Sequence, residues 1–243
     1  MKKFLMILAA VTLSVTTFGV LAATSDASQP SFSGSIDATS RADYRGQEYS
    51  TGPDLNLSLK VSDIWLTGLY VRGDFGKVGN TFPLDSAGSA IESDVGVGYT
   101  LSLTQDFKID MSMNHVYNAQ EFLTKRDGQL MPSDYNEFRA NATYNVLFAQ
   151  IGQGIGQNKN TYVALGVNIP VTDKIKVGGA VSAYHYQLNG FEGSSTRYNN
   201  SEVFASYNLL KNVSVYGKYS FGGKNLSNEV LANYGIVGVQ VKI

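Results

Sequence analysis

The chain has 243 residues, with 19 basic and 20 acidic residues, two histidines and no cysteine. The near balance of charge argues against a nucleic-acid partner, and the lack of cysteine excludes disulfides and thiolate metal sites. Beyond the first residues no run of eighteen apolar residues occurs, so we expect no transmembrane helix in the mature protein.

The start of the chain is typical of a secretory signal peptide. Lys2 and Lys3 precede an apolar run that ends in small residues near Ala22. We expect residues 1–22 to be removed, with cleavage after Ala23 and an uncleaved membrane anchor as the alternatives. Loss of the two lysines leaves a net charge near −3 on the mature chain.

From about Ser31 to the end, short segments are apolar at every second position. In one of them Leu55, Leu57 and Leu59 alternate with polar residues. A period of two indicates β-strand, and strands with one apolar face, one polar face and no helix among them are what a transmembrane barrel requires. We therefore predict that residues 23–243 form a single all-β domain, an antiparallel outer-membrane β-barrel. A soluble β-sandwich is the alternative.

The alternation predicts twelve strands. They lie near residues 31–44, 53–62, 64–75, 93–104, 107–117, 135–146, 147–155, 160–171, 174–186, 198–210, 213–221 and 230–243. The pattern is weakest around residues 145–156, where glycines replace side chains, and ten strands result if that hairpin is misread. The connections alternate between tight and long, as the periplasmic turns and outer loops of a barrel do.

The charged residues of each strand share its polar side, and we find none on the apolar side. A charge that faces lipid at mid-membrane costs roughly 2–4 kcal/mol, so this segregation favours a barrel with a polar lumen. The predicted pore-lining residues are Asp37, Arg41, Asp43, Lys60, Arg72, Asp74, Asp94, Lys108, Asp110, Glu137, Arg139, Lys176, Glu202, Lys218 and Lys242.

These inward charges are expected to be unevenly distributed along the lumen. Lysines gather toward the periplasmic end, namely Lys60, Lys108, Lys176 and Lys242, and acids lie nearer the outside, namely Asp43, Asp74, Asp94, Glu137 and Glu202. Two interpretations remain open. The charges filter ions as rings of one sign, or the arginines pair with acids on neighbouring strands and fill the lumen.

Aromatic residues and both histidines fall on the apolar side. Several lie near strand ends and predict interfacial girdles: Trp65, Tyr99, Tyr117, Tyr144, Tyr207 and Tyr219. His115 and His185 share this outward position near the extracellular ends of their strands, so we interpret them as girdle residues rather than as ligands or catalytic groups.

Two segments carry a resemblance to a known family. Thr39-Ser40-Arg41-Ala42-Asp43-Tyr44-Arg45-Gly46 resembles the Tyr and Arg-Gly signature of the TorF-type family of outer-membrane porins, and Asp134-Tyr135-Asn136-Glu137 is similar to an acidic-tyrosine segment of that family. The resemblance implies an outer-membrane barrel with a channel role, and it carries no catalytic or ligand-binding residue over to this chain.

The partners expected from the sequence are outer-membrane lipid, ions or small hydrophilic solutes, and the barrel-assembly machinery. The machinery recognises terminal strands such as Val237-Gly238-Val239-Gln240-Val241-Lys242-Ile243, although Ile243 stands where an aromatic residue is usual. No feature predicts a cofactor or a metal site.

The sequence predicts a narrow passive channel. Twelve strands about 4.8 Å apart and tilted by about 40° enclose a backbone diameter of roughly 24 Å. A non-conducting structural or adhesive barrel, acting through loops such as 76–91 and 118–133, is the alternative, and a lipid-modifying enzyme is a third class. The segment Phe82-Pro83-Leu84 either folds inward as a constriction or belongs to an ordinary surface loop.

Overall fold

The computed structural model describes residues 29–45, 47–50, 52–78, 90–118, 134–156, 159–187, 195–223, 230 and 232–243. The expected signal peptide and the segment Phe82–Leu84 lie outside these residues. Within them, no helix is long and apolar enough to cross a membrane.

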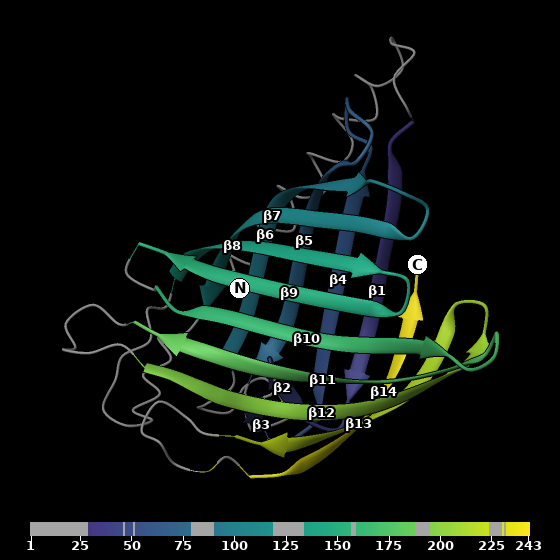
Figure 1. Ribbon diagram of the computed structural model, residues 1–243. Coiled ribbons are helices and arrows are strands. Elements are labelled where there is room, and N and C mark those ends of the chain that lie inside the picture. The colour runs from purple at the N-terminus through teal and green to yellow at the C-terminus, as the bar shows by residue number, and fades with distance from the viewer. Residues whose placement is uncertain are drawn as a thin grey trace.

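Twelve strands form a closed antiparallel barrel, which confirms the predicted fold and strand number (Figure 1). The strands are β1 (Ser31–Thr39), β4 (Asp54–Ser62), β5 (Leu69–Val78), β6 (Ala90–Ser102), β7 (Phe107–Asn118), β8 (Asp134–Tyr144), β9 (Leu147–Ile155), β10 (Thr161–Pro170), β11 (Ile175–Tyr186), β12 (Ser195–Leu210), β13 (Val213–Gly222) and β14 (Tyr234–Lys242). Each strand pairs with the next barrel strand along the chain, β1 with β4 included, and β14 pairs with β1 to close the wall. A separate two-stranded sheet, β2 (Ala42–Tyr44) and β3 (Gln47–Ser50), lies between β1 and β4 in the chain.

The two ends of the barrel differ in their connections. Residues 63–68, 103–106, 145–146, 171–174 and 211–212 make short turns at one end, which we call the short-turn end. The opposite end carries the remaining connections, and we call it the long-loop end. The uncertain hairpin is a tight turn at Asn145 and Val146, where Asn145 adopts a φ of 53° and its N–H donates to the Asp106 carbonyl at 3.0 Å.

The predicted start of the third strand at residue 64 is wrong, because residues 63–68 form a turn. Asp63 and Trp65 have positive φ values of 59° and 62°, which extended strands do not adopt. The Asp63 carboxylate accepts a hydrogen bond from the Gly68 N–H at 2.8 Å and closes the turn. Trp65 is therefore at a turn and is 65% exposed, rather than on a strand face.

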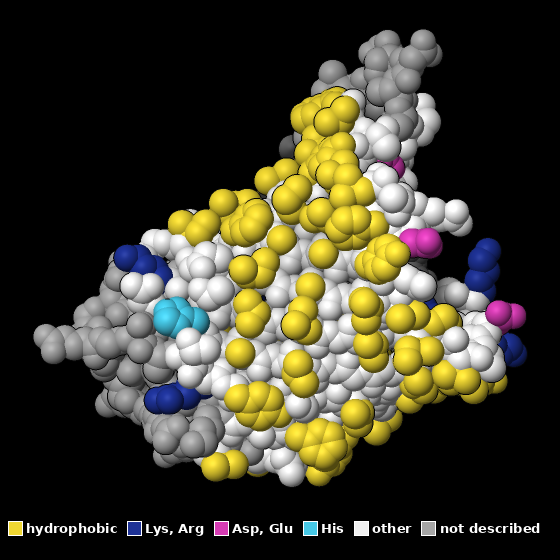
Figure 2. All heavy atoms as spheres, in the orientation of Figure 1, with side chains coloured by type: hydrophobic (Ala, Val, Ile, Leu, Met, Phe, Trp, Pro, Cys, Tyr) yellow, Lys and Arg dark blue, Asp and Glu magenta, His cyan; other side chains and the backbone are white. Residues whose placement is uncertain are grey.

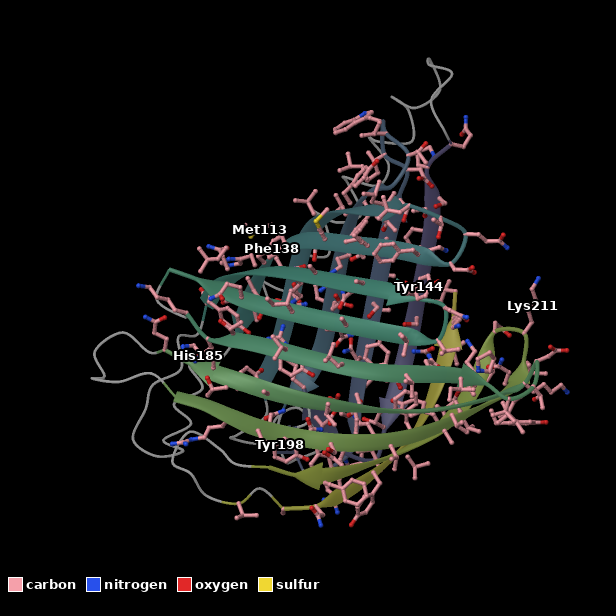
Figure 3. The ribbon with its side chains drawn as sticks, viewed as in Figure 1. Met113, Phe138, Tyr144, His185, Tyr198 and Lys211 are labelled. Atoms are coloured by element: carbon pink, nitrogen blue, oxygen red, sulfur yellow. The ribbon has the colours of Figure 1, made fainter. Side chains whose placement is uncertain are left out.

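The outer face of the wall is apolar along its middle, and charged side chains gather at the two ends (Figure 2). Alternate residues of β14 show the pattern, since Val237 is 66% exposed while Ile236 is buried. Met113, Phe138 and Tyr144 project outward from β7 and β8 (Figure 3). An exposed apolar band of this kind is stable in lipid and costly in water.

This band gives a direct test of which face meets lipid. Val237→Lys is expected to lower the free energy of unfolding in lipid vesicles by roughly 2–4 kcal/mol, because it places a charge in the hydrocarbon layer. Gln240→Lys, on the opposite face of the same strand, is the matched control and is expected to change it far less. Equal effects of the two substitutions, measured by urea unfolding, would contradict the assignment of faces.

Candidate functional site: the lumen and its inner hairpin

The inner face carries most of the charged residues predicted to line a pore. The strand registers place these on it: Asp37, Lys60, Arg72, Asp74, Asp94, Lys108, Asp110, Glu137, Arg139, Lys176, Glu202, Lys218 and Lys242. Polar alternation therefore locates them on the wall that surrounds the lumen.

Arg41 and Asp43 are exceptions, because the prediction that they belong to the first barrel strand is wrong. That strand ends at Thr39, where the Thr39 hydroxyl donates to the Arg41 carbonyl at 2.8 Å and turns the chain. Arg41 lies in the link, and Asp43 lies on β2. The segment 42–50 is a hairpin of its own, which we call the inner hairpin.

The inner hairpin crosses the lumen. Its turn residue Arg45 has a φ of 53° and reaches Glu137 on β8, with Nη1 to Oε1 and Nη2 to Oε2 both at 2.6 Å. In the strand order β8 and β9 lie across the barrel from β1, where the hairpin originates. A Cβ at Gly152 of β9 would lie 2.6 Å from Arg45 Nη2, so this glycine makes room for the guanidinium. Figure 1 shows β2 and β3 behind the near wall.

Arg45 is held by more than its carboxylate partner. Its guanidinium carbon lies 4.9 Å from the centre of the Tyr162 ring, a cation–π distance. The Arg45 side chain is 14% exposed and that of Glu137 is 3% exposed. A bidentate pair with so little water around it is strong and geometrically specific.

A β-bulge on β12 holds the backbone of the hairpin turn. The register with β11 shifts between Ser182 and Ala183, so that Asn199 is an extra residue and turns inward. The fully buried Asn199 amide donates to the Arg45 carbonyl at 2.5 Å and to the Ser182 hydroxyl at 2.9 Å. Because of the bulge, the neighbouring residues Asn199 and Asn200 both face the lumen, whereas regular alternation would direct one of them outward.

The first strand of the hairpin is fixed on the opposite side of the lumen. Lys218 Nζ on β13 donates to both Asp43 oxygens, at 2.7 and 2.8 Å, and the Tyr234 hydroxyl donates to Asp43 at 2.8 Å. Lys218 also lies 3.7 Å from Glu202. The hairpin is therefore anchored to two regions of the wall, through charges of opposite sign.

The arginines of the inner wall pair with acids, as one of the two interpretations predicted. Arg72 lies 3.3 Å from Asp94 and 3.6 Å from Asp74, and Arg139 bonds both Asp94 and Glu137. Together with Arg45 these residues form a continuous network of alternating charge across β5, β6 and β8. Charges that neutralise one another in this way make no ring of one sign.

The lysines toward the short-turn end behave differently. Lys60 lies 3.9 Å from Asp110 and 3.7 Å from the Tyr70 ring centre, whereas Lys108, Lys176 and Lys242 form no ion pair with any described residue. These four lysines stand on β4, β7, β11 and β14, two to four strands apart around the barrel. We call these four lysines the basic ring. The sequence predicted that they gather toward this end and left open whether they filter ions.

Two cavities open beside this ring. One of about 580 Å³ is lined by residues of β8 to β12, including Phe148, Asn168 and Lys176. The other, of about 320 Å³, shares Asn168 and Lys176 and extends to Lys218 and Lys242. Open space therefore remains on the short-turn side of the inner hairpin, with both apolar and polar side chains around it.

Sequence reasoning missed Arg45 and Asn199 as site residues. Arg45 belongs to the first segment that resembles the TorF-type family and Glu137 to the second, so the salt bridge joins the two segments. The run Tyr198-Asn199-Asn200-Ser201 could have drawn attention to Asn199, because two consecutive amide residues interrupt the alternation there. Both amide residues are buried on the inner face.

Both histidines lie on the outer side and contact neutral groups. His115 Nδ1 is 3.0 Å from the Asn136 side-chain oxygen, and His185 Nδ1 is 2.9 Å from the Thr196 hydroxyl. His185 lies near the long-loop end (Figure 3). Neither contact contains the serine or carboxylate that a hydrolytic site needs.

The fold is similar to that of outer-membrane porins and channels of known structure. The KdgM porin matches with a TM-score of 0.54 and 12% identity, over 86% of this chain and 98% of that one. The NanC porin matches with a TM-score of 0.53 and 13% identity, over 86% and 100%. The COG4313 outer membrane channel from Pseudomonas putida F1 matches with a TM-score of 0.51 and 8% identity, over 87% and 94%. No family model and no curated protein matches the chain.

Proposed function

We propose that this protein is a porin-like channel of the bacterial outer membrane, through which ions and small hydrophilic solutes diffuse passively. The observation that carries the proposal is a closed twelve-stranded wall that is apolar outside and charged inside. Barrels of eight strands are filled by their own side chains, whereas twelve strands leave space for solutes.

The similar structures support a hydrophilic solute. The KdgM porin in complex with disordered oligogalacturonate matches this chain with a TM-score of 0.53 and 11% identity, over 87% of this chain and 98% of that one. The TorF-type resemblance remains a prediction, and it points to the same channel role. Outer-membrane lipid and the barrel-assembly machinery remain the other expected partners.

The basic ring gives the channel an expected preference. Lys108, Lys176 and Lys242 face the lumen without acidic partners among the described residues, while the arginines are neutralised. A ring of one sign raises the local concentration of the opposite ion. We therefore propose that anions pass more readily than cations.

Planar-bilayer recording tests both statements. Purified mature protein is expected to give discrete conductance steps in symmetrical salt, and a reversal potential of the anion-selective sign in a salt gradient. Neutralising Lys108, Lys176 and Lys242 to glutamine is expected to move that potential toward zero, because the ring then lacks its unpaired charges. The matched control neutralises Lys174 and Lys211, which lie in turns.

A folded, heat-modifiable barrel that gives no steps would contradict the channel and favour the second candidate, a non-conducting structural or adhesive barrel. One observation supports this candidate, since the inner hairpin crosses the lumen and is fixed at both Asp43 and Arg45. We do not propose an enzyme, because His115 and Ser112 lie on opposite faces of β7.

A further inference from the structure

Two phenylalanines at the short-turn end face the lumen and are not fully covered by other side chains, unlike inward apolar residues such as Val116 and Ile236, which are buried. The channel function does not account for them. Phe148 on β9 and Phe204 on β12 are partly exposed and line the cavity of about 580 Å³ at the short-turn end. Apolar surface in a water-filled passage is unfavourable unless something apolar covers it. The exposed faces of these rings are therefore suited to a ligand with an apolar part.

Each ring lies over a glycine of the neighbouring strand. Phe148 is paired with Gly166 on β10, and Phe204 is paired with Gly178 on β11. A Cβ on either glycine would collide with the ring, so both rings lie low against the wall. Because β10 and β11 are adjacent, the rings approach the same floor from its two sides. We call this arrangement the two-ring cleft.

A cation stands at the mouth of the two-ring cleft. Lys176 lines the same cavity as both rings, forms no ion pair with any described residue, and lies two residues before Gly178 on the same face of β11. Asn168, the register partner of Gly178, adds an amide. Ligand pockets commonly have this volume and combine aromatic walls with a few polar groups that fix orientation.

We propose that the two-ring cleft binds small aromatic carboxylates, with the ligand ring against Phe148 and Phe204 and its carboxylate on Lys176. Stacking and charge pairing then act on opposite ends of one ligand. The inference rests on the proposed channel, because the cleft is reached through the lumen, and it names a solute class for that channel.

Channel block by benzoate is the test. Benzoate added on the short-turn side is expected to reduce the current at lower concentration than either acetate, which lacks the ring, or benzyl alcohol, which lacks the charge. Phe204→Leu keeps the apolar volume but removes the ring and is expected to weaken block roughly 3- to 10-fold. Lys176→Gln is expected to weaken it roughly 3-fold or more.

Matched controls lie outside the lumen. Phe138→Leu changes a ring on the outer face, and Lys211→Gln changes a lysine in a turn at the same end, and neither is expected to alter the block (Figure 3). Heat-modifiable migration verifies that each variant is folded. If Phe204→Leu does not fold, Phe148→Leu replaces it.

The outcomes separate the cleft from the channel. Equal block by acetate and benzoate, or full benzoate block in the folded Phe204→Leu barrel, would overturn the two-ring cleft and leave the channel standing. If the protein gives no conductance, saturation-transfer NMR of benzoate with the detergent-solubilised barrel shows whether the cleft binds benzoate. Ring-proton transfer lost in Phe204→Leu supports the cleft without a channel, and its absence in the parent protein overturns the cleft.

Discussion

Replacing residues 41–52 by a short Asn-Gly link is expected to raise the single-channel conductance roughly two-fold or more, because it removes the inner hairpin from the current path. The wall should tolerate the change, since Thr39 of β1 and Asp54 of β4 are register partners at its edge. Conductance in planar bilayers, compared at the same salt concentration, measures the effect.

A second variant keeps the length of the chain. Asp43→Asn combined with Arg45→Gln removes both charged anchors but leaves the hairpin in place, and is expected to give currents that fluctuate between the parent level and a higher one.

The variant without residues 41–52 decides whether the hairpin narrows the lumen. If this variant folds and its conductance equals that of the parent protein, the hairpin does not obstruct the lumen. That result would contradict the constriction inferred from the Arg45 and Asp43 contacts.

Glu137→Ala is expected to lower the free energy of unfolding by about 3–5 kcal/mol, because it leaves two guanidinium groups in a poorly hydrated site without their shared carboxylate. Arg45 and Arg139 both bond this carboxylate, which is 3% exposed. Equilibrium urea unfolding in lipid vesicles measures the loss. Faster proteolysis within residues 41–52 should accompany it.

A double-mutant cycle isolates the pair across the lumen. Adding Arg45→Ala to Glu137→Ala is expected to recover about 1–3 kcal/mol relative to the sum of the single effects. Glu202→Ala is the matched control, since its carboxylate is 23% exposed and lies 3.7 Å from one lysine, and a loss below about 1 kcal/mol is expected there. Additive effects of Arg45 and Glu137 would show that their contact contributes nothing to stability.

The barrel wall could be predicted from the sequence because its physics is local. Each residue of a strand faces either lipid or the lumen, so alternation alone places Lys60 inside and Leu59 outside. The short turns follow the ends of the alternation. The turn at Asp63 was misjudged because Trp65 shares the parity of Leu69 and Val71 and so continues the apolar side of the predicted strand, although Asp63 and Trp65 adopt left-handed backbone angles.

The inner hairpin could not be predicted because its contacts are not local. Residues 42–44 continue the alternation of β1, so nothing in the pattern marks the point at which the chain leaves the wall. Whether Asp43 meets lipid-side, lumen-side or solvent groups depends on Lys218 and Tyr234, which lie near the other end of the sequence. The pairing of Arg45 with Glu137 likewise joins two segments that only the closed barrel brings together.

The anchors of the inner hairpin also constrain the order of folding. They join residues separated by 92, 154, 175 and 191 positions in the chain, on β8, β12, β13 and β14 respectively. Contacts of such separation form late. Closing a long loop costs conformational entropy, and this cost falls once the strands between the two residues have paired. The hairpin at the beginning of the barrel can therefore dock only after the last strand has closed the wall, so resistance of residues 41–52 to protease during assembly would report completion of the barrel.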